Sequence, residues 1–378
     1  MHRILLLYIS TNSGHHHAAK AIEESLHSLE PGIKTLNLNC FNYTNPILEK
    51  VINNVYNKVI KNKPEVWEYL YDNPVIVRRT RKFRKLIHEF NSKKLKKLID
   101  HFRPDAVICT QAFPAGMIAD FKKTYNLNFP LIGVLTDYSP HSYWIYDNID
   151  TYIVPSLQTR QRFVDSFIAK DKIFIYGIPI SARFGAPTDK EATFSSLKLD
   201  KNIPVLLIMG GGQGLGPIEE IIFAVNTLDV DFQVVVVCGI NNKLRKWLER
   251  RQKLFRKRMA ILGYSKNTNA LMDIASLLVT KPGGLTTAEA LTKGLPVVIV
   301  NPIPGQEAKN TEFLLSEGVA VKAKDALDAA ALIGELLNAP EKLRQMREAS
   351  FKHARPDSAV NISKLALKLI NDKKRDNS

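Results

Sequence analysis

Four loops of this sequence carry residues that could do chemistry, and the first of them is Ser10–His17. Gly14 lets the backbone approach a ligand closely, and His15 can accept a proton from a bound hydroxyl group. A capped helix with solvent-facing histidines is the alternative interpretation. The three adjacent histidines do not predict a metal site, because neighbouring helical positions point about 100° apart and cannot close on one ion.

The second loop, Gly210–Pro217, is the richest in glycine. Backbone amides in such a turn, between a strand and a helix, form a cradle for phosphate oxygens. The glycine spacing fits neither the dinucleotide-binding fingerprint nor a Walker loop, so we expect a phosphate site of another kind. A purely structural tight turn is the alternative.

The third loop, Lys281–Ala290, predicts the most specific chemistry. A diphosphate could lie on the amides around Gly284–Thr287, with the dipole of the following helix behind it. Glu289, about one turn into that helix, could reach the hydroxyl groups of a ribose. Farther along the chain, Gln306 and Glu307 offer side chains suited to sugar hydroxyls. Glycine-bearing loops after three strands of one half favour a nucleotide site over ordinary strand and helix pairs.

The fourth loop, Thr136–Trp144, contains two titratable groups, Asp137 and His141. Titratable groups at strand ends are candidates for catalysis, so Asp137 is a second candidate for proton transfer. A turn-capping aspartate is the alternative, because Asp side chains commonly bond the backbone of their own turn.

Alternating strand and helix patterns must position these four loops. Short apolar runs predict strands, and helical stretches follow most of them, which favours parallel sheets. The predicted strands are Arg3–Ile9, Lys34–Asn39, Ala106–Thr110, Leu131–Leu135, Thr151–Val154, Ile173–Tyr176, Val205–Met209, Gln233–Cys238, Met259–Leu262, Leu277–Thr280 and Val297–Val300.

An irregular stretch, Gly177–Asp200, divides the predicted strands into two groups and is expected to be the linker. We therefore expect an α/β protein with two doubly wound, Rossmann-like domains that face one cleft. The expected domains are residues 1–180 and 181–355, and a C-terminal helix within residues 356–378 is expected to return to the first domain. Ligands of such folds bind beyond the carboxyl ends of the strands, where all four loops lie.

The charge of the chain indicates a polyanionic partner. The 378 residues include 53 Lys and Arg against 37 Asp and Glu, which gives a formal charge of +16. Residues 51–100 hold 13 basic and 5 acidic residues, and a second basic cluster is Lys243–Arg258. The aromatics interleaved with the first cluster favour a surface that rests on anionic lipid, with a merely solvated basic helix as the alternative. The residues predicted to contact the membrane or a ligand at its surface are Gly14, Trp67, Trp144, Arg78, Arg79, Arg81, Lys82, Arg84 and Lys85.

Cysteine spacing and hydropathy indicate the cellular compartment in which the protein works. Cys40, Cys109 and Cys238 have the spacing of neither a disulfide framework nor a zinc site, which favours a reducing cytosol. No apolar run approaches the roughly 18 residues of a membrane-spanning helix, so we expect any membrane contact to be peripheral. No nucleic-acid-binding motif is present, and a nucleic-acid binder would leave the glycine loops unexplained.

Together the motifs resemble the monogalactosyldiacylglycerol synthase and processive diacylglycerol glucosyltransferase family, a relative of the peptidoglycan lipid-intermediate N-acetylglucosaminyltransferase. The resemblance extends over nearly the whole chain. It implies the glycosyltransferase-B fold, a UDP-sugar donor in the second domain, and a lipid acceptor in the first, at the inner face of the cell membrane. The residues that carry it are Gly14-His15 with Ala18, Ala19 and Ala21, Thr136–Trp144, Gly177-Ile178-Pro179, Gly210–Pro217, Lys281–Ala290 and Pro304–Glu307 with Asn310.

The resemblance also implies roles for single residues of this chain. The plant members carry a functional histidine after the strand Ala106–Thr110, where this sequence has Gln111 and Ala112. Because that histidine is absent here, both His15 and Asp137 are candidates for the general base. Those expected at the diphosphate are Gly212, Gln213, Gly283, Gly284 and Thr286, flanked by Gly211, Gly214 and Thr287. Those expected at the rest of the donor are Glu289 for the ribose, Tyr264 for the uracil, and Gln306 and Glu307 for the sugar.

We expect an inverting transfer of glucose or galactose from UDP to a diacylglycerol-type lipid. Amides aimed at the leaving diphosphate would stabilise the transition state, so no cofactor and no metal are expected. One competing interpretation is a nucleotide-sugar 2-epimerase of the same architecture, and another is a non-enzymatic basic protein that binds nucleic acid or a membrane. The choice between glucose and galactose stays open, because Gln306 and Glu307 can bond either sugar.

Overall fold

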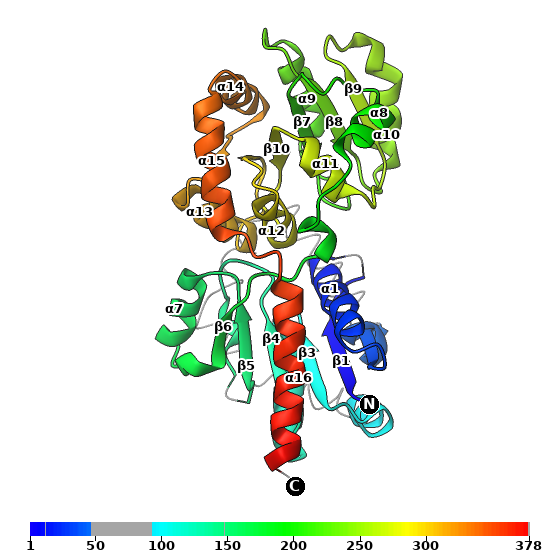
Figure 1. The fold of residues 1–378 in the computed structure, drawn as a ribbon, viewed down its shortest axis with the longest axis vertical. Coiled ribbons are helices and arrows are strands. Elements are labelled where there is room, and N and C mark those ends of the chain that lie inside the picture. The colour runs from blue at the N-terminus through cyan, green and yellow to red at the C-terminus, as the bar shows by residue number, and fades with distance from the viewer. Residues whose placement is uncertain (12, 47–92, 147, 377–378) are drawn as a thin grey trace. The chain divides into compact units, whose positions relative to one another are not determined.

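The computed structural model describes residues 1–11, 13–46, 93–146 and 148–376. Two compact units form the chain (Figure 1). The first comprises Met1–Ala182, Pro304–Gln306 and Asp357–Ser378, and the second comprises Arg183–Ile303 and Glu307–Pro356. Each unit contains a six-stranded sheet whose neighbouring strands are all parallel. The expected class of two parallel α/β domains is therefore confirmed.

The sheet of the first unit has the strand order β2-β1-β3-β4-β5-β6. Its strands are β1 (Arg3–Tyr8), β2 (Lys34–Asn39), β3 (Ala106–Cys109), β4 (Leu131–Val134), β5 (Thr151–Val154) and β6 (Ile173–Ile175). Its helices are α1 (Gly14–Leu29), α2 (Cys40–Thr44), residues 93–102, α6 (Ala112–Thr124), η1 (Ser142–Trp144), α7 (Leu157–Asp165), η2 (Lys170–Lys172) and α16 (Ser358–Asp376). Because β1, β3 and β4 are neighbours, the loops that follow them meet at one edge of the sheet.

Alternation along β1 divides the core of the first unit into two layers. Ile4 and Leu6 pack on one side of the sheet with α1 and α16, whereas Leu5 and Leu7 pack on the other side with α6. Successive side chains of a strand point to opposite faces. Because helices cover both faces, the strand reads as one continuous apolar run.

The long C-terminal helix α16 packs beside α1 in the first unit (Figure 1). Ile362 and Ala366 are fully buried in the same cluster as Ile22 of α1. The Ser363 hydroxyl donates to the Ile22 carbonyl at 3.3 Å, and the Ser358 hydroxyl donates to the Ile178 carbonyl at 2.8 Å. The end of the chain thus completes the first unit after the second has been built.

The sheet of the second unit has the strand order β12-β11-β10-β7-β8-β9. Its strands are β7 (Val205–Met209), β8 (Gln233–Val237), β9 (Met259–Leu262), β10 (Leu277–Thr280), β11 (Val297–Ile299) and β12 (Ala320–Lys322). Its helices are η3 (Ala182–Phe184), α8 (Lys190–Leu197), α9 (Ile218–Asn226), α10 (Asn242–Arg251), η4 (Gln252–Leu254), α11 (Thr268–Ile274), α12 (Gly284–Thr292), α13 (Gln306–Ser316), α14 (Ala326–Leu337) and α15 (Pro340–His353). The glycine-rich loop after β7 and the loop after β10 therefore lie side by side.

Two elements of the second unit differ from the sequence prediction. The stretch expected to be an irregular linker contains α8, which Asp189 caps and which Lys198 ends in the left-handed conformation (φ 56°). The strand β12, Ala320–Lys322, is absent from the predicted strands. Among the residues that the structure describes, no helix is long and apolar enough to cross a membrane.

Candidate active site

The first cluster of functional side chains lies where β1, β3 and β4 end. His15 sits in the first turn of α1, whose N-cap is Ser13. The Ser13 hydroxyl accepts from the His16 amide at 3.3 Å and donates to the Ser10 carbonyl at 2.6 Å. Ser10 itself adopts the left-handed conformation, with φ of 67°. This capped turn fixes the direction in which the His15 side chain points from α1.

Two threonines hold the His15 side chain. Its Nδ1 lies 3.1 Å from the carbonyl oxygen of Thr110 and 2.7 Å from the hydroxyl oxygen of Thr136. The Thr110 hydroxyl donates back to the His15 carbonyl at 2.9 Å. Thr110 follows β3 and Thr136 follows β4, so two neighbouring strands supply the partners of one imidazole.

These contacts determine which nitrogen of His15 carries the proton. A carbonyl oxygen can only accept a hydrogen bond, so we assign the proton to Nδ1, which donates to Thr110. Burial lowers the pKa of His15 from 6.5 to about 4, although the bond to Thr110 raises it. The imidazole is therefore neutral at pH 7, and its Nε2 carries the lone pair that can accept a proton.

A second histidine, His141, lies close enough to His15 for their charges to interact. Burial and, to a smaller extent, positive charge on His15 lower the pKa of His141 to about 3. The His141 ring centroid lies 5.6 Å from that of Tyr143 and 6.3 Å from that of Trp144. Two neutral imidazoles in one site offer both donors and acceptors to a polar ligand.

The other predicted residues of the first unit lie in different surroundings. Asp137 is half-buried and directly follows Thr136, which places it in the loop that holds His15. Gly14 is exposed at the start of α1. Trp144, predicted to contact the acceptor or the membrane, is only 5% exposed and packs in the core beside Gly133. That prediction is corrected, because the buried indole has too little free surface to rest on lipid.

The glycine-rich loop between β7 and α9 is a tight turn with free backbone donors. The Gly214 amide donates to the Gly211 carbonyl at 3.1 Å. Both residues adopt left-handed conformations, with φ of 62° and 67°, which favour glycine. Within the described part of the chain, the amides of Gly212 and Gln213 have no hydrogen-bond partner. They are therefore available to an anionic ligand.

This loop packs directly on the loop that follows β8. A Cβ atom at Gly214 would lie 2.0 Å from the Cys238 carbonyl oxygen, and one at Gly239 would lie 2.2 Å from the Gly212 carbonyl oxygen. The Ile240 amide also donates to Gly212, at 3.0 Å. Because only glycine fits at Gly214 and Gly239, the two loops form one closely packed backbone surface.

The loop after β10 opens α12 without a side-chain cap. The N-cap is Gly283, which has no side chain to offer. The amides of residues 284–286 have no partner among the residues described, so they and the helix dipole favour an anion at this end. The Thr280 hydroxyl donates to the Met209 carbonyl at 2.8 Å, which ties the end of β10 to the start of the glycine-rich loop.

Glu289 and Thr287 differ in their availability to a ligand. Burial raises the pKa of the half-buried Glu289 to about 8, so its carboxyl group is protonated at neutral pH and can donate as well as accept. Thr287, by contrast, is 3% exposed, and its amide donates to the Gly283 carbonyl at 2.9 Å. Thr287 is thus engaged in the helix itself.

Glu307, predicted to bind the sugar, is engaged within the protein. One carboxylate oxygen lies 3.2 Å from Lys281 Nζ, and the other accepts from the Ile303 amide at 2.7 Å. The Asn310 side chain donates to the Pro282 carbonyl at 3.0 Å. These bonds fasten the start of α13 to the loop before α12. Glu307 therefore positions the loop that carries the free amides, a role that the sequence does not predict.

Comparison with known proteins identifies the family. Residues 15–180 match the model for Monogalactosyldiacylglycerol (MGDG) synthase, and residues 189–353 match the model for Glycosyl transferases group 1. The processive diacylglycerol beta-glucosyltransferase of Bacillus thuringiensis (strain Al Hakam) is 31% identical over 362 residues, or 95% of this chain and 92% of that protein. The chain belongs to the MGDG synthase and processive diacylglycerol glucosyltransferase family. It is a glycosyltransferase.

Solved structures show the fold of this glycosyltransferase. MurG of Acinetobacter baumannii superposes with a TM-score of 0.67 at 17% identity, over 97% of this chain and 100% of that chain. The UDP-GlcNAc 2-epimerase from Neisseria meningitidis gives 0.62 at 13% identity, over 97% and 100%. The expected glycosyltransferase-B fold is confirmed. The fold does not separate a transferase from an epimerase, whereas the sequence relatives favour the transferase.

Within this MGDG synthase family member, the donor-site predictions spread over several strand ends of one sheet. The glycine-rich loop and residues 283–286 meet at the neighbouring ends of β7 and β10. Tyr264 follows β9 at the edge of the sheet and is 52% exposed. Gln306 begins α13, after β11. The stretch from β9 to β11 is wide enough for an extended ligand, since strands are spaced about 4.8 Å apart.

The threonines that hold His15 are residues that sequence reasoning missed. The available signal was their position, because each follows a strand that is a neighbour of β1 or of β3. Gln111, where plant members carry a histidine, caps α6: its side chain accepts from the Phe113 amide at 2.7 Å. Gln111 is thus committed to helix capping.

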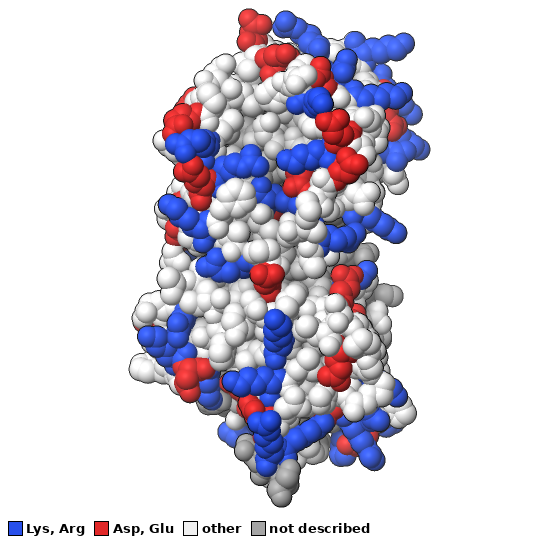
Figure 2. All heavy atoms as spheres, viewed as in Figure 1, with Lys and Arg blue, Asp and Glu red and all other residues white. Residues whose placement is uncertain are grey.

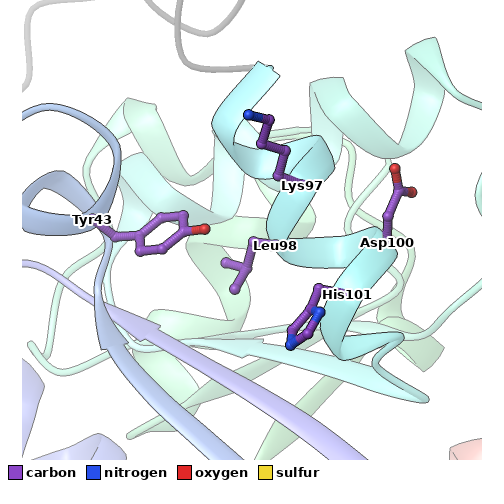
Figure 3. A pocket seen from close by; sticks show the side chains of 5 residues that line it. All are labelled: Tyr43, Lys97, Leu98, Asp100 and His101. Carbon is purple, nitrogen blue, oxygen red and sulfur yellow. The ribbon is translucent and has the colours of Figure 1, made fainter.

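Most residues predicted to touch the membrane lie outside the described residues: Trp67, Arg78, Arg79, Arg81, Lys82, Arg84 and Lys85. A surface pocket of about 580 Å³ lies on the first unit between α2 and the helical residues 93–102 (Figure 3). None of the predicted active-site residues lines it; its lining is Tyr43, Lys97, Leu98, Asp100 and His101. In the described parts of the chain no His, Cys, Asp and Glu cluster could hold a metal ion.

Proposed function

We propose that this glycosyltransferase transfers glucose or galactose from a UDP-sugar to a diacylglycerol-type lipid, with inversion at the anomeric carbon. The observation that carries the proposal is the uncapped start of α12 beside the glycine-rich loop, where backbone amides are free to bind a diphosphate. The Bacillus relative is named for a diacylglycerol acceptor and a beta-glucosyl product, which supports the lipid acceptor and favours glucose.

The donor half of the proposal depends on backbone charge. As the sugar leaves, negative charge grows on the diphosphate, and the amides of Gly212, Gln213 and residues 284–286 stabilise it. Protonated Glu289 exchanges hydrogen bonds with the ribose, and Tyr264 lies against the uracil. Gln306 and Glu307 bond the sugar hydroxyls, for which Glu307 gives up one of its present partners. The reaction then needs no metal, because the amides perform the neutralising role.

The acceptor half depends on His15. The lipid hydroxyl oxygen attacks the anomeric carbon, the bond between that carbon and the diphosphate oxygen breaks, and UDP departs with the electron pair. The hydroxyl proton passes to Nε2 of His15, while the bond from Nδ1 to Thr110 keeps the ring in the accepting tautomer. Asp137 is the alternative base, because it lies in the same loop.

We propose that the reaction takes place at the inner face of the cell membrane, to which the protein binds peripherally. A diacylglycerol acceptor stays in the bilayer, so the enzyme must come to the membrane surface. The basic residues 51–100 support this, because each cation near an anionic bilayer contributes about 1 kcal/mol.

A donor screen tests the function. Purified protein is mixed with detergent-dispersed diacylglycerol and UDP-glucose, UDP-galactose or UDP-N-acetylglucosamine, with and without EDTA, and the lipid product is identified by mass and by sugar analysis. We expect lipid-dependent UDP release with one hexose donor, unchanged by EDTA. Epimerisation of UDP-N-acetylglucosamine without lipid would instead establish the 2-epimerase. Binding of duplex DNA without turnover of any donor would overturn the enzymatic proposal.

A further inference from the structure

A second strongly basic surface lies on the donor-binding unit, and the proposed function does not use it. Residues 243–258 contain nine Lys or Arg and one acidic residue, Glu249, which is a formal charge of +8. Residues 51–100 also carry +8. The two segments therefore account for the whole +16 of the chain, and the remaining residues are balanced.

The fold presents this charge on one face of α10. Leu244 and Leu248 are buried in the core, whereas Lys243, Lys246 and Arg250 are all exposed. Their spacing of three and four residues places the three cations in one row along the helix. Figure 2 shows Lys and Arg side chains gathered over the part of the second unit that contains α10 and β9.

Exposed apolar side chains lie among these cations. Leu254, in η4, is 66% exposed, and Phe223 of α9 is 45% exposed. The Phe223 ring packs against Trp247 and Phe255, with centroid distances of 5.5 Å and 5.6 Å. The guanidinium of Arg251 lies 4.5 Å from the centroid of the Trp247 ring. The surface thus combines a cationic rim with an apolar centre.

Local structure explains only part of this arrangement. The helix dipole favours Arg250 and Arg251 in the last turn of α10, but Lys253 and Arg256 lie beyond the helix and gain nothing from it. Like charges at this density repel one another, and an anionic partner would relieve that repulsion. Nucleic acid would neutralise the charge but would leave Leu254 against a polar backbone.

We propose that the α10 surface, formed by α10, η4 and residues 255–258, rests on anionic phospholipid and is a second membrane contact of the enzyme. Lys and Arg side chains attract acidic headgroups, while Leu254 and Phe223 enter the boundary between headgroups and acyl chains. The proposal goes beyond the proposed function, which places the acceptor and the membrane contact in the first unit.

The test compares two triple variants of the full chain. The surface variant is Arg250→Gln, Lys253→Gln and Arg256→Gln. The control variant is Lys322→Gln, Lys324→Gln and Lys352→Gln, which removes the same charge from exposed sites away from α10. Two of the control sites lie at or just beyond β12, five strand spacings or about 24 Å across the sheet from β9. Sedimentation with phosphatidylglycerol vesicles measures the partition of each protein.

We expect the surface variant to lose partition by on the order of a hundredfold, or about fivefold per cation, and the control variant to stay within about twofold of the wild type. Binding of the wild type should weaken with salt. The Leu254→Ser variant should lose a few-fold of partition. Turnover of detergent-dispersed lipid, which needs no membrane contact, should be unchanged in all variants, so an inactive wild type would refute the proposed function without affecting the vesicle result.

Equal partition of the surface and control variants would overturn the proposal. It would also be overturned if the surface variant lost affinity for duplex DNA while keeping its partition into vesicles, because the surface would then serve nucleic acid. Partition of the wild type into neutral phosphatidylcholine vesicles equal to that into phosphatidylglycerol would likewise show that charge does not direct binding. Thermal unfolding of each variant checks that its fold is intact.

Discussion

The two units build their parts of the candidate active site from different atoms. The first unit uses side chains: the imidazole of His15 is held by Thr110 and Thr136. The second unit uses the backbone: its free donors are amides of the glycine-rich loop and of the start of α12. A side chain can be removed by one substitution, whereas a backbone amide can only be displaced. We therefore expect proton transfer to be sensitive to point changes and donor binding to be sensitive mainly to glycine geometry.

Of the changes that test this difference between the two units, removal of the His15 imidazole should have the largest effect. In His15→Ala the hydroxyl proton has no acceptor, so kcat should fall by about 10² to 10⁴-fold, while the affinity for UDP, bound by the other unit, stays nearly constant. Steady-state kinetics with the detergent-dispersed acceptor and titration with UDP measure the two quantities. His17→Ala is the matched control. It removes an imidazole two residues farther along the same helix, α1, and His17 contacts neither Thr110 nor Thr136. If His15→Ala keeps its turnover and Asp137→Asn loses it, Asp137 is the base.

Adding one methyl group to the glycine-rich loop tests the backbone half of the site, that is, the part that the second unit builds from backbone amides. In Gly214→Ala the new Cβ would overlap the Cys238 carbonyl, and the residue would have to adopt a φ of 62°. We expect a loss of about 2–4 kcal/mol in the free energy of unfolding, together with weaker UDP binding. Urea unfolding and UDP titration measure both.

Gly212→Ala is the control for this glycine prediction, because a Cβ there would meet nothing within 4 Å. Its free energy of unfolding should change by less than about 1 kcal/mol. Equal losses in both variants would show that the loop responds to any added side chain. The contrast between close packing at Gly214 and open space at Gly212 would then carry no weight.

The sequence predicts this backbone half better than the side-chain half. Strand ends follow from apolar runs, and the expected bounds of Val205–Met209 and Leu277–Thr280 are those of β7 and β10. The positions of the two loops that follow these strands are therefore set by local pattern alone. Contacts such as Thr110 with His15 depend on strand order, which brings together residues 95 positions apart. Pattern along the chain does not contain that information.

The same reasoning explains the other differences. Trp144 fits a membrane contact by residue type, but tertiary packing buries it beside Gly133. Glu307 fits a sugar ligand by type, and its ion pair with Lys281 could not be predicted because the two residues lie in different segments of the chain. The polar segment 188–200 lacks an apolar face, so the helix α8 within it is supported by its Asp189 cap and is not visible as a periodic pattern.

Removing the Thr136 hydroxyl tests how much its hydrogen bond to His15 contributes to turnover. Thr136→Val deletes the oxygen that lies 2.7 Å from Nδ1, while the Thr110 carbonyl still selects the tautomer. The loss of one hydrogen bond, about 1–1.5 kcal/mol, should lower kcat roughly tenfold and leave KM for the donor unchanged. Thr136→Ser restores the hydroxyl and should recover most of the rate. A variant pair with equal kcat values would show that the threonine only packs beside the ring.

The last change tests Glu289, a titratable side chain of α12. The pKa of Glu289 is raised from 4.5 to about 8 by burial. The folded state therefore stays protonated while the unfolded state ionises above pH 4.5, so stability falls as pH rises from about 4.5 towards 8. Glu289→Gln cannot ionise and should lack this fall. Melting temperatures are measured at pH 5, 6.5 and 8. The melting temperature of the wild type should fall below that of Glu289→Gln as pH increases, by about ten degrees over this range.

Saturating UDP should keep or widen this divergence if the ribose hydroxyls bind the protonated carboxyl group of Glu289, because binding to the protonated form raises the folded-state pKa further. Parallel melting curves at all three pH values would mean that Glu289 is ionised in the folded protein. The second unit, like the first, would then rely on a charged or ionisable side chain rather than on backbone and neutral groups.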